Sequence, residues 1–196
     1  MGVLLVSGHD LGEPSDWVQR WQHLMPPGAR VLDVACGSGR HMSWLAQRGC
    51  HCTGIDRLTE ALAEASRYGS TVQADIEDGP WPLIQNDLPQ QFDVVLVTNY
   101  LWRPLFPVLL QSLAPGALLL YETFAQGNET VGKPARPDFL LQTGELLRLC
   151  QSLRIVAFED GFLPDPERFV QRIAACRQSH APKAGRPPAR YPLSLK

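Results

Sequence analysis

The sequence predicts an α/β fold, a doubly wound and mostly parallel sheet of seven strands with helices on both faces. Three observations predict it. Continuous apolar runs, which are typical of strands buried on both faces, alternate with segments of helical periodicity. A glycine turn at 37–39 connects the first of these runs to a helix. Right-handed crossovers between such units place the helices on the two faces of a single sheet.

The first half of the chain shows this alternation clearly. Ser15 or Asp16 can cap an N-terminal helix within residues 15–28, which Pro26-Pro27-Gly28 ends. The elements that we expect next are a strand at 30–35, a helix at 39–48, a strand at 50–55, a helix at 59–67 and a strand at 70–74. A Pro-rich loop at 79–83 then interrupts the alternation.

The second half continues the pattern and ends differently. We expect a strand at 92–97, a helix at 105–113, a strand at 117–121, a helix at 143–152, a strand at 153–159 and a strand at 168–176. The last two strands are joined through Gly161 to Pro166, which leaves no room for a crossover helix, so they should pair antiparallel. The sequence shows no internal repeat, and residues 1–176 are expected to form a single domain.

The turn after the first strand has the parts of a nucleotide cofactor site. Gly37 and Gly39 allow the backbone to turn sharply and to approach a ligand. The helix after them directs free N–H groups at whatever binds there. Asp56 ends the second strand about 17 residues later, near the spacing at which an acidic residue binds ribose hydroxyls.

Two residues indicate which nucleotide this is. A dinucleotide fingerprint has a third glycine, and Met42 occupies that position, which weakens the interpretation as an NAD(P)-linked oxidoreductase without removing it. No Gly-Lys-Ser/Thr of a phosphate-binding loop follows. Asp33, inside the first strand, would repel a pyrophosphate and suits a ligand that carries a cation.

The segment Val-Leu-Asp-Val-Ala-Cys-Gly-Ser-Gly at 31–39 resembles the first motif of class I S-adenosylmethionine (SAM)-dependent methyltransferases, hydrophobic-Asp-x-x-x-Gly-x-Gly. The resemblance implies SAM as cofactor and S-adenosyl-L-homocysteine (SAH) as product. It also implies a strand order of 3-2-1-4-5-7-6 with strand 7 antiparallel, Asp56 on the ribose and Asp75 beside the adenine. The cofactor-binding residues expected on this basis are Asp33, Ala35, Gly37, Gly39, Asp56, Arg57, Asp75, Ile76 and Asn99.

The loops at the carboxyl ends of the later strands are expected to receive the methyl acceptor. The segments 99–107, 121–129 and 133–141 resemble the bacterial tellurite-resistance-type (TehB-like) methyltransferases, whose position 102, Trp here, is more familiar as His. The long loop at 122–142 is expected to act as an acceptor-side lid. Because Tyr100-Leu101 follows Asn99 in place of a Pro pair, a DNA-base or glutamine acceptor is disfavoured.

Methyl transfer from a sulfonium mainly requires alignment of the reactants, and a general base only for acceptors of high pKa. The candidates for a base are Tyr100, Tyr121 and Glu122, although Tyr121 could equally be a core residue. The candidates for contact with the substrate are Trp102, Arg103, Phe124, Asn128 and Arg136, of which the two arginines could instead form surface salt bridges. The predicted function is methyl transfer to a small molecule, with a non-catalytic SAM-binding regulator as the alternative.

Composition limits the partners. The net charge is −2, but five of the 18 basic residues lie in 177–196, which leaves 13 against 20 acidic residues in the remainder. This acidic body makes nucleic acid an unlikely partner, and the Pro-rich basic tail at 177–196 is expected to be disordered. Five irregularly spaced cysteines and no evident signal peptide indicate a cytoplasmic protein. We expect neither a metal site nor a membrane anchor, and we expect a monomer or a homodimer.

Overall fold

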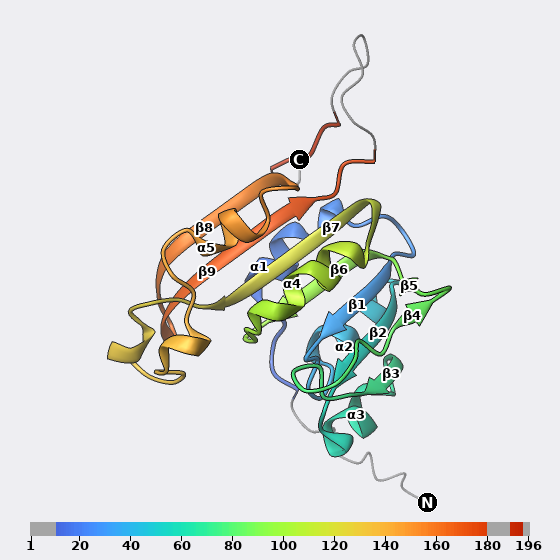
Figure 1. The fold of residues 1–196 in the computed structure, drawn as a ribbon, viewed down its shortest axis with the longest axis horizontal. Coiled ribbons are helices and arrows are strands. Elements are labelled where there is room, and N and C mark those ends of the chain that lie inside the picture. The colour runs from blue at the N-terminus through green and yellow to red at the C-terminus, as the bar shows by residue number, and fades with distance from the viewer. Residues whose placement is uncertain (1–10, 180–188, 194–196) are drawn as a thin grey trace, which may run out of the picture.

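A seven-stranded sheet in the order β3-β2-β1-β6-β7-β9-β8 organises the computed structural model, which describes residues 11–179 and 189–193 (Figure 1). The first five strands of this order are parallel, and β9 is antiparallel to both of its neighbours. Counted along the chain, this is the predicted order and the predicted antiparallel end. The strands are β1 Arg30–Val34, β2 His51–Asp56, β3 Gly69–Gln73, β6 Phe92–Thr98, β7 Leu113–Phe124, β8 Arg154–Pro164 and β9 Glu167–Cys176.

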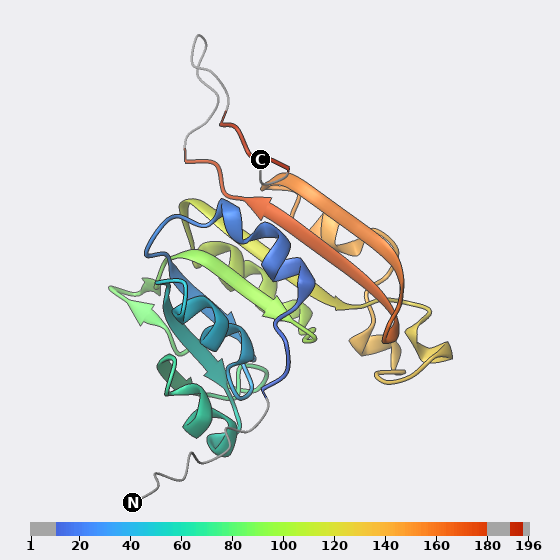
Figure 2. The same ribbon diagram turned by 180° about the vertical axis from the view of Figure 1, so that it is seen from behind.

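Helices cover both faces of the sheet, as predicted. Figure 1 looks onto the face with α4 (Phe106–Gln111) and α5 (Glu145–Leu149), and Figure 2 shows the opposite face with α1 (Asp16–Trp21) and α2 (Arg40–Ala46). The core residues of α3 (Thr59–Ala65) belong to the cluster on the α1 side. The domain is therefore a three-layer sandwich.

Strand β6 shows how the sequence produces the two core layers. Its side chains alternate between the faces, so that Val94 and Leu96 join the cluster under α1 and α2, while Val95 and Val97 join the cluster under α4. All four are fully buried. A strand that is buried on both faces must be apolar throughout, which is why the run at 92–97 is not amphipathic.

Several elements differ in length from the prediction. The predicted strands at 117–121 and 153–159 extend to Phe124 and Pro164, because ladder pairing between β7, β9 and β8 continues past the apolar core. The observed helices are shorter than the predicted ones, and the N-terminal helix is followed by a 3-10 turn at Gln22–Leu24. Since β7 includes residues 122–124, the predicted lid begins only after it.

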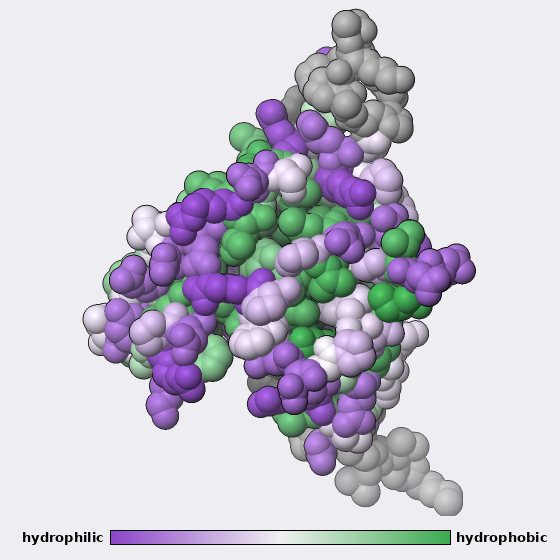
Figure 3. Space-filling view, viewed as in Figure 1, coloured by the Kyte–Doolittle hydropathy of each residue, from purple (hydrophilic) through white to green (hydrophobic). Residues whose placement is uncertain are grey.

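A small hairpin was not predicted. Strands β4 (Ile84–Gln85) and β5 (Leu88–Pro89) pair across Asn86 and Asp87, which both adopt positive φ angles, as a tight hairpin turn requires. Its apolar side chains Ile84 and Leu88 are 52% and 67% exposed. In Figure 3, hydrophobic surface is visible on the right of the molecule, where Figure 1 places this hairpin.

The predicted disordered tail is in part ordered. Arg177 continues the pairing of β9, since its N–H donates to Ala117 O at 2.9 Å. Farther on, Tyr191 packs against the core under α1, and the ring Nε2 of His23 lies 2.9 Å from Pro192 O. Residues 189–193 thus lie on the domain, which corrects the prediction for that stretch. Residues 180–188 and 194–196 of the tail, and residues 1–10 of the expected domain, lie outside the described residues.

Candidate active site

Two adjoining cavities lie at the carboxyl ends of the parallel strands. The first, which we call the glycine-loop cavity, has a volume of about 360 Å³ and is lined by Leu11, residues 35–38, Arg40, His41 and residues 98–100. The second, the Asp56 cavity, measures about 290 Å³ and is lined by Ala35, residues 56–58, residues 74–77 and Tyr100. Because Ala35 and Tyr100 line both, the pair can hold an elongated ligand with two different parts.

The glycine loop is held in a conformation that most residues avoid. Ala35, Gly37 and Gly39 have φ angles of 55°, 55° and 83°. A Cβ on Gly39 would lie 2.9 Å from the Cα and Cβ atoms of Ala65 in α3, so only glycine fits there. The non-glycine Ala35 stores backbone strain at the point where the two cavities meet, a location typical of ligand sites.

Met42 is accommodated by a glycine on a neighbouring strand. A Cβ on Gly54 of β2 would lie 2.5 Å from Met42 Sδ and 2.6 Å from Cys36 Sγ. Met42 is fully buried there. The close helix–strand packing that a third glycine gives in dinucleotide sites is thus achieved by Gly54, and the helix carries the large side chain.

Asp56 connects the glycine loop to helix α3. Its Oδ2 accepts a hydrogen bond from Gly37 N at 2.8 Å, and its Oδ1 accepts one from Leu58 N at 3.0 Å. Asp56 therefore caps helix α3, and this role is compatible with the predicted role in ligand binding. Each carboxylate oxygen retains a second lone pair toward the Asp56 cavity, which suits the two hydroxyls of a ribose.

The other predicted cofactor residues gather around the same two cavities. Arg57, Asp75 and Ile76 line the Asp56 cavity. Asp75 is exposed, and its Oδ1 accepts a hydrogen bond from Glu77 N at 3.0 Å. Asn99 lines the glycine-loop cavity with a φ angle of 54°. Gly39 and Asp33 lie behind the walls; their ligand roles, like those of the lining residues, remain predictions.

Asp33 is a buried carboxylate with an unpaired oxygen. Only 1% of the residue is exposed, and among the described residues its Oδ2 has no hydrogen-bond partner. Burial, opposed by the charge of Arg40, raises the pKa of Asp33 to about 7. The nearest basic atom is His41 Nδ1 at 3.9 Å, in the wall of the glycine-loop cavity. Such a carboxylate favours a cationic group in that cavity, which fits the methionine ammonium of SAM.

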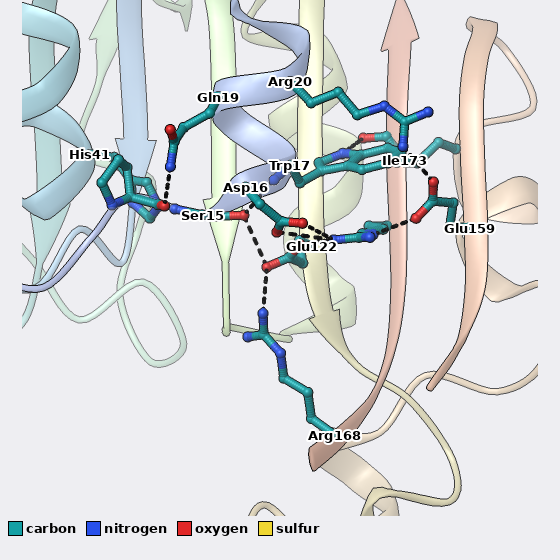
Figure 4. A network of polar contacts seen from close by, with 12 residues as sticks. Ser15, Asp16, Trp17, Gln19, Arg20, His41, Glu122, Glu159, Arg168 and Ile173 are labelled. Atoms are coloured by element: carbon teal, nitrogen blue, oxygen red, sulfur yellow. Dashed lines mark hydrogen bonds and ion pairs between the residues drawn. The ribbon is translucent and has the colours of Figure 1, made fainter. Parts of the chain in front are cut away.

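A buried polar network connects this wall to the end of β7 (Figure 4). The Ser15 N–H donates to His41 Nε2 at 3.2 Å, and the Ser15 hydroxyl donates to Glu122 Oε1 at 3.1 Å. The other oxygen of Glu122 lies 3.3 Å from Arg172 Nη1. Arg172 also binds Glu159 at 2.7 Å and Asp16 at 3.1 Å. Of these residues only Glu122 was predicted as functional, because no local pattern relates positions so distant in the sequence.

The two tyrosines predicted as bases differ in their contacts, because the hydroxyl of Tyr100 has no hydrogen-bond partner among the described residues. Tyr121 is fully buried, stacks on Phe106 with ring centres 5.1 Å apart, and donates from its hydroxyl to Tyr100 O at 2.9 Å. Burial raises the pKa of Tyr121, and burial together with the nearby Glu77 raises the pKa of Tyr100. Neither phenol is therefore poised to lose a proton near neutral pH, so the geometry gives no support to a role for them as bases.

Two of the predicted substrate residues, Arg103 and Asn128, make contacts that hold the segment 125–141 in place. Arg103 binds both oxygens of Glu145, at 2.6 and 2.9 Å, and donates to the carbonyls of Asp138 and Leu140. The structure thus favours the salt-bridge interpretation for Arg103.

Asn128 is 1% exposed and spans from Pro134 O to Phe169 N, while Arg136 pairs with Asp138 on the surface. Trp102 and Phe124 are half-buried. For none of these residues does the geometry test the predicted contact with an acceptor, so those contacts remain predictions.

Residues 31–116 match a family model described as Methyltransferase domain. TehB from Haemophilus influenzae superposes with a TM-score of 0.67 at 18% identity, over 83% of this chain and 62% of that one. A TehB-like SAM-dependent methyltransferase from Corynebacterium glutamicum superposes with a TM-score of 0.60 at 16% identity, over 83% and 87%. Residues 31–116, which are less than half of this chain, are thus similar to a methyltransferase domain, and the described residues share the fold of these solved methyltransferases. At these identities the likeness to the solved structures is one of fold.

Curated relatives of this chain are named for different acceptors. A tRNA U34 carboxymethyltransferase of Klebsiella pneumoniae is 32% identical over 129 residues, which are 59% of this chain and 38% of the relative. A ubiquinone biosynthesis O-methyltransferase of Azoarcus is 32% identical over 115 residues, 55% of this chain and 48% of the relative. The chain thus spans less than half of the length of these relatives.

The comparisons bear out the predicted resemblance to SAM-dependent methyltransferases and support SAM as the methyl donor. They do not decide the acceptor. Across the described residues, no helix is both long and apolar enough to span a membrane.

Proposed function

We propose that the protein is a SAM-dependent methyltransferase that acts on a small-molecule acceptor. The observation that carries this proposal is the placement of two carboxylates around one pair of cavities. Asp33 lies buried behind the glycine-loop cavity, with an unpaired oxygen 3.9 Å from Nδ1 of the wall residue His41, and Asp56 lines the adjoining cavity while tying down Gly37. An ammonium at one end and ribose hydroxyls at the other would satisfy both.

The residues of the chain would bind and orient the reactants. The strained loop at 35–39 approaches the ligand along its middle, and Asp75 and Ile76 form the end of the Asp56 cavity where a base would lie. When bound, SAM supplies a methyl group already activated on a sulfonium. The remaining contribution of the protein is therefore proximity and alignment, because the leaving group needs no protonation.

The acceptor would approach beyond the ends of β6 and β7. The outline of the molecule in Figure 3 is indented between the segment 125–141, at lower left, and the ends of the parallel strands. Since the Tyr121 hydroxyl is engaged, burial raises the pKa of Tyr100 and Glu122 is paired with arginines, we propose transfer without a dedicated base. Transfer without a base suits an acceptor atom that is nucleophilic at neutral pH without losing a proton of high pKa.

The experiment has a binding stage and a turnover stage. Isothermal titration of the purified protein with SAM and with SAH tests the cofactor site, and absence of binding by folded protein would overturn the proposal. Incubation with radiolabelled SAM and separate pools of small metabolites, inorganic oxyanions and bulk tRNA then tests the acceptor. Label in the metabolite or oxyanion pools supports the proposed class, whereas label in tRNA alone would overturn it.

A non-catalytic SAM-binding protein is the second candidate, because burial raises the pKa of both tyrosines and Glu122 is paired with arginines. It predicts tight SAM binding with no label transferred to any pool and no SAH formed. Measurement of SAH after long incubation with each acceptor pool therefore separates the two candidates. The family model that residues 31–116 match describes a methyltransferase domain, which disfavours the oxidoreductase alternative.

A further inference from the structure

Residues 11–15, which we call the N-terminal strap, lie against the glycine-loop cavity. Leu11 lines that cavity together with His41 of α2 and Thr98 of β6. In Figure 2 the strap descends from α1 and passes between α2 and the end of β6. Side-chain contacts fix its backbone at three points: Ser15 N to His41 Nε2 (3.2 Å), Arg40 Nη1 to Glu13 O (3.4 Å) and Gln19 Nε2 to Pro14 O (2.9 Å).

Ser15 joins two sides of the site. Its backbone N–H reaches His41 in the cavity wall, and its hydroxyl reaches Glu122 at the end of β7 (Figure 4). The three residues are 7%, 2% and 1% exposed. Their hydrogen bonds are therefore shielded from water, and the strap cannot leave the cavity without breaking them.

These contacts exceed what the start of α1 requires. Capping the helix needs only the bond in which Ser15 Oγ accepts from Trp17 N, at 3.1 Å. The additional bonds point away from the helix, one toward the donor cavity and one toward the acceptor side. His41 can accept from Ser15 only as a neutral imidazole, and burial, with the charge of Arg40, lowers its pKa to about 3.

We propose that His41 and Ser15 are positioning residues that latch the N-terminal strap over the methyl donor and tie it to Glu122. This inference rests on the proposed function. Opening the strap is then the step that admits SAM and releases SAH, and closing it excludes water from the reacting methyl group. Neither residue touches the reacting atoms; they act through the strap.

The test measures the release of SAH by stopped-flow tryptophan fluorescence, since Trp17 and Trp21 lie in the adjoining helix. His41→Leu removes the acceptor for Ser15 N and should speed release about fivefold to tenfold, the effect of one lost buried hydrogen bond. His41→Gln places an amide oxygen near the position of Nε2 and should restore slow release. His51→Leu, at the exposed first residue of β2, is the matched control and should change nothing, because His51 lines neither cavity.

A second variant covers the case in which His41→Leu fails to fold. Gln19 is exposed and lines neither cavity, but it anchors Pro14 O. Gln19→Ala should loosen the strap, speed SAH release about twofold to threefold, and raise hydrogen exchange at the amides of residues 11–15.

The outcomes separate this inference from the proposed function. Absence of SAM and SAH binding by the wild-type protein would overturn both. Binding by the wild type, with release rates and strap exchange unchanged in His41→Leu or in Gln19→Ala, would overturn the strap alone. Faster release in His41→Leu that His41→Gln does not restore would also count against the latch, because it would indicate a general packing defect.

Discussion

The carboxylate of Asp56 accepts a 2.8 Å hydrogen bond from the backbone N–H of Gly37. These two residues lie at the ends of neighbouring parallel strands, where β1 turns into the glycine loop and β2 turns toward α3. The same carboxylate caps Leu58 N at 3.0 Å. One side chain therefore fixes the loop that passes along the ligand and the helix that flanks it.

Replacing Asp56 tests its predicted role in ligand binding. We expect Asp56→Ala to weaken SAM binding by about 1–3 kcal/mol, because two hydrogen bonds from ribose hydroxyls to a charged group are lost. Isothermal titration measures this effect. The control is Asp93→Asn, which removes an acid paired with Arg30 at the opposite ends of β1 and β6. Equal affinity in Asp56→Ala and in the wild type would exclude ribose binding by this carboxylate.

Asp33 should make the ligand-free protein less stable as the pH rises. Its pKa is near 3.8 in the unfolded chain and about 7 in the fold. Above pH 4 Asp33 therefore binds fewer protons in the unfolded state than in the fold, and its contribution to stability falls until the pH passes about 7, while the contribution of His41, whose pKa burial lowers to about 3, rises up to about pH 6.5. At about 1.4 kcal/mol for each pKa unit, the loss is on the order of 4 kcal/mol.

Urea denaturation at pH 5 and at pH 8 checks this prediction. Asp33→Asn should flatten the decline, since the amide does not titrate, whereas Asp87→Asn, at the tip of the exposed hairpin, should leave it unchanged. Asp33→Asn should also weaken SAM binding at pH 8, where the carboxylate of Asp33 in the wild type is charged. A wild-type profile that rises from pH 5 to pH 8, in parallel with that of Asp33→Asn, would contradict the assigned burial effect.

The close packing of Met42 over Gly54 predicts a large effect for one methyl group. Gly54→Ala would bring a Cβ to 2.5 Å from Met42 Sδ and 2.6 Å from Cys36 Sγ, so buried side chains must shift. We expect a loss of about 1–3 kcal/mol in the free energy of unfolding, measured by urea denaturation. Gly132→Ala is the matched control, because no atom lies within 4 Å of its added Cβ. Equal stability of the two variants would show that β2 and α2 separate easily.

The same pair of residues shows how far the sequence can be interpreted. Met42 in the third glycine position pointed away from a dinucleotide, and the family model that residues 31–116 match describes a methyltransferase domain. The compensating Gly54 could not be recognised, because its meaning depends on which helix packs over β2. Periodicity likewise predicted the strands, whose order the methyltransferase resemblance implied, but it missed the ends of β7 and β8, where backbone pairing, not apolar burial, continues the strands.

The acceptor side was the least predictable part. Glu122 follows an apolar run, and nothing near it in the sequence indicates that Ser15, 107 positions earlier, would contact it. Arg103 looked like an anion-binding residue because guanidinium groups suit oxyanions, but the fold supplies Glu145, 42 positions later, as its partner. Residue type predicts which chemistry is possible, and long-range contacts decide where it is used.

The contacts of Arg103 predict the behaviour of the acceptor-side segment. Its guanidinium binds Glu145 and two carbonyls of the turn at 138–140, while it lines neither cavity. We expect Arg103→Ala to cost about 1.5–3 kcal/mol of local stability, seen as faster hydrogen exchange across residues 125–141, because charge-assisted bonds to that segment are lost. SAM affinity should stay unchanged.

Arg136→Ala provides the comparison for Arg103→Ala, because Arg136 lies in the same segment but pairs only with the exposed Asp138, and a surface pair of this kind contributes little. If Arg103 positions the segment, turnover of an identified acceptor should fall in Arg103→Ala and not in Arg136→Ala. Unchanged exchange over residues 125–141 in Arg103→Ala would show that the segment is held by Asn128 and the bridge between Ala125 and Leu141 instead.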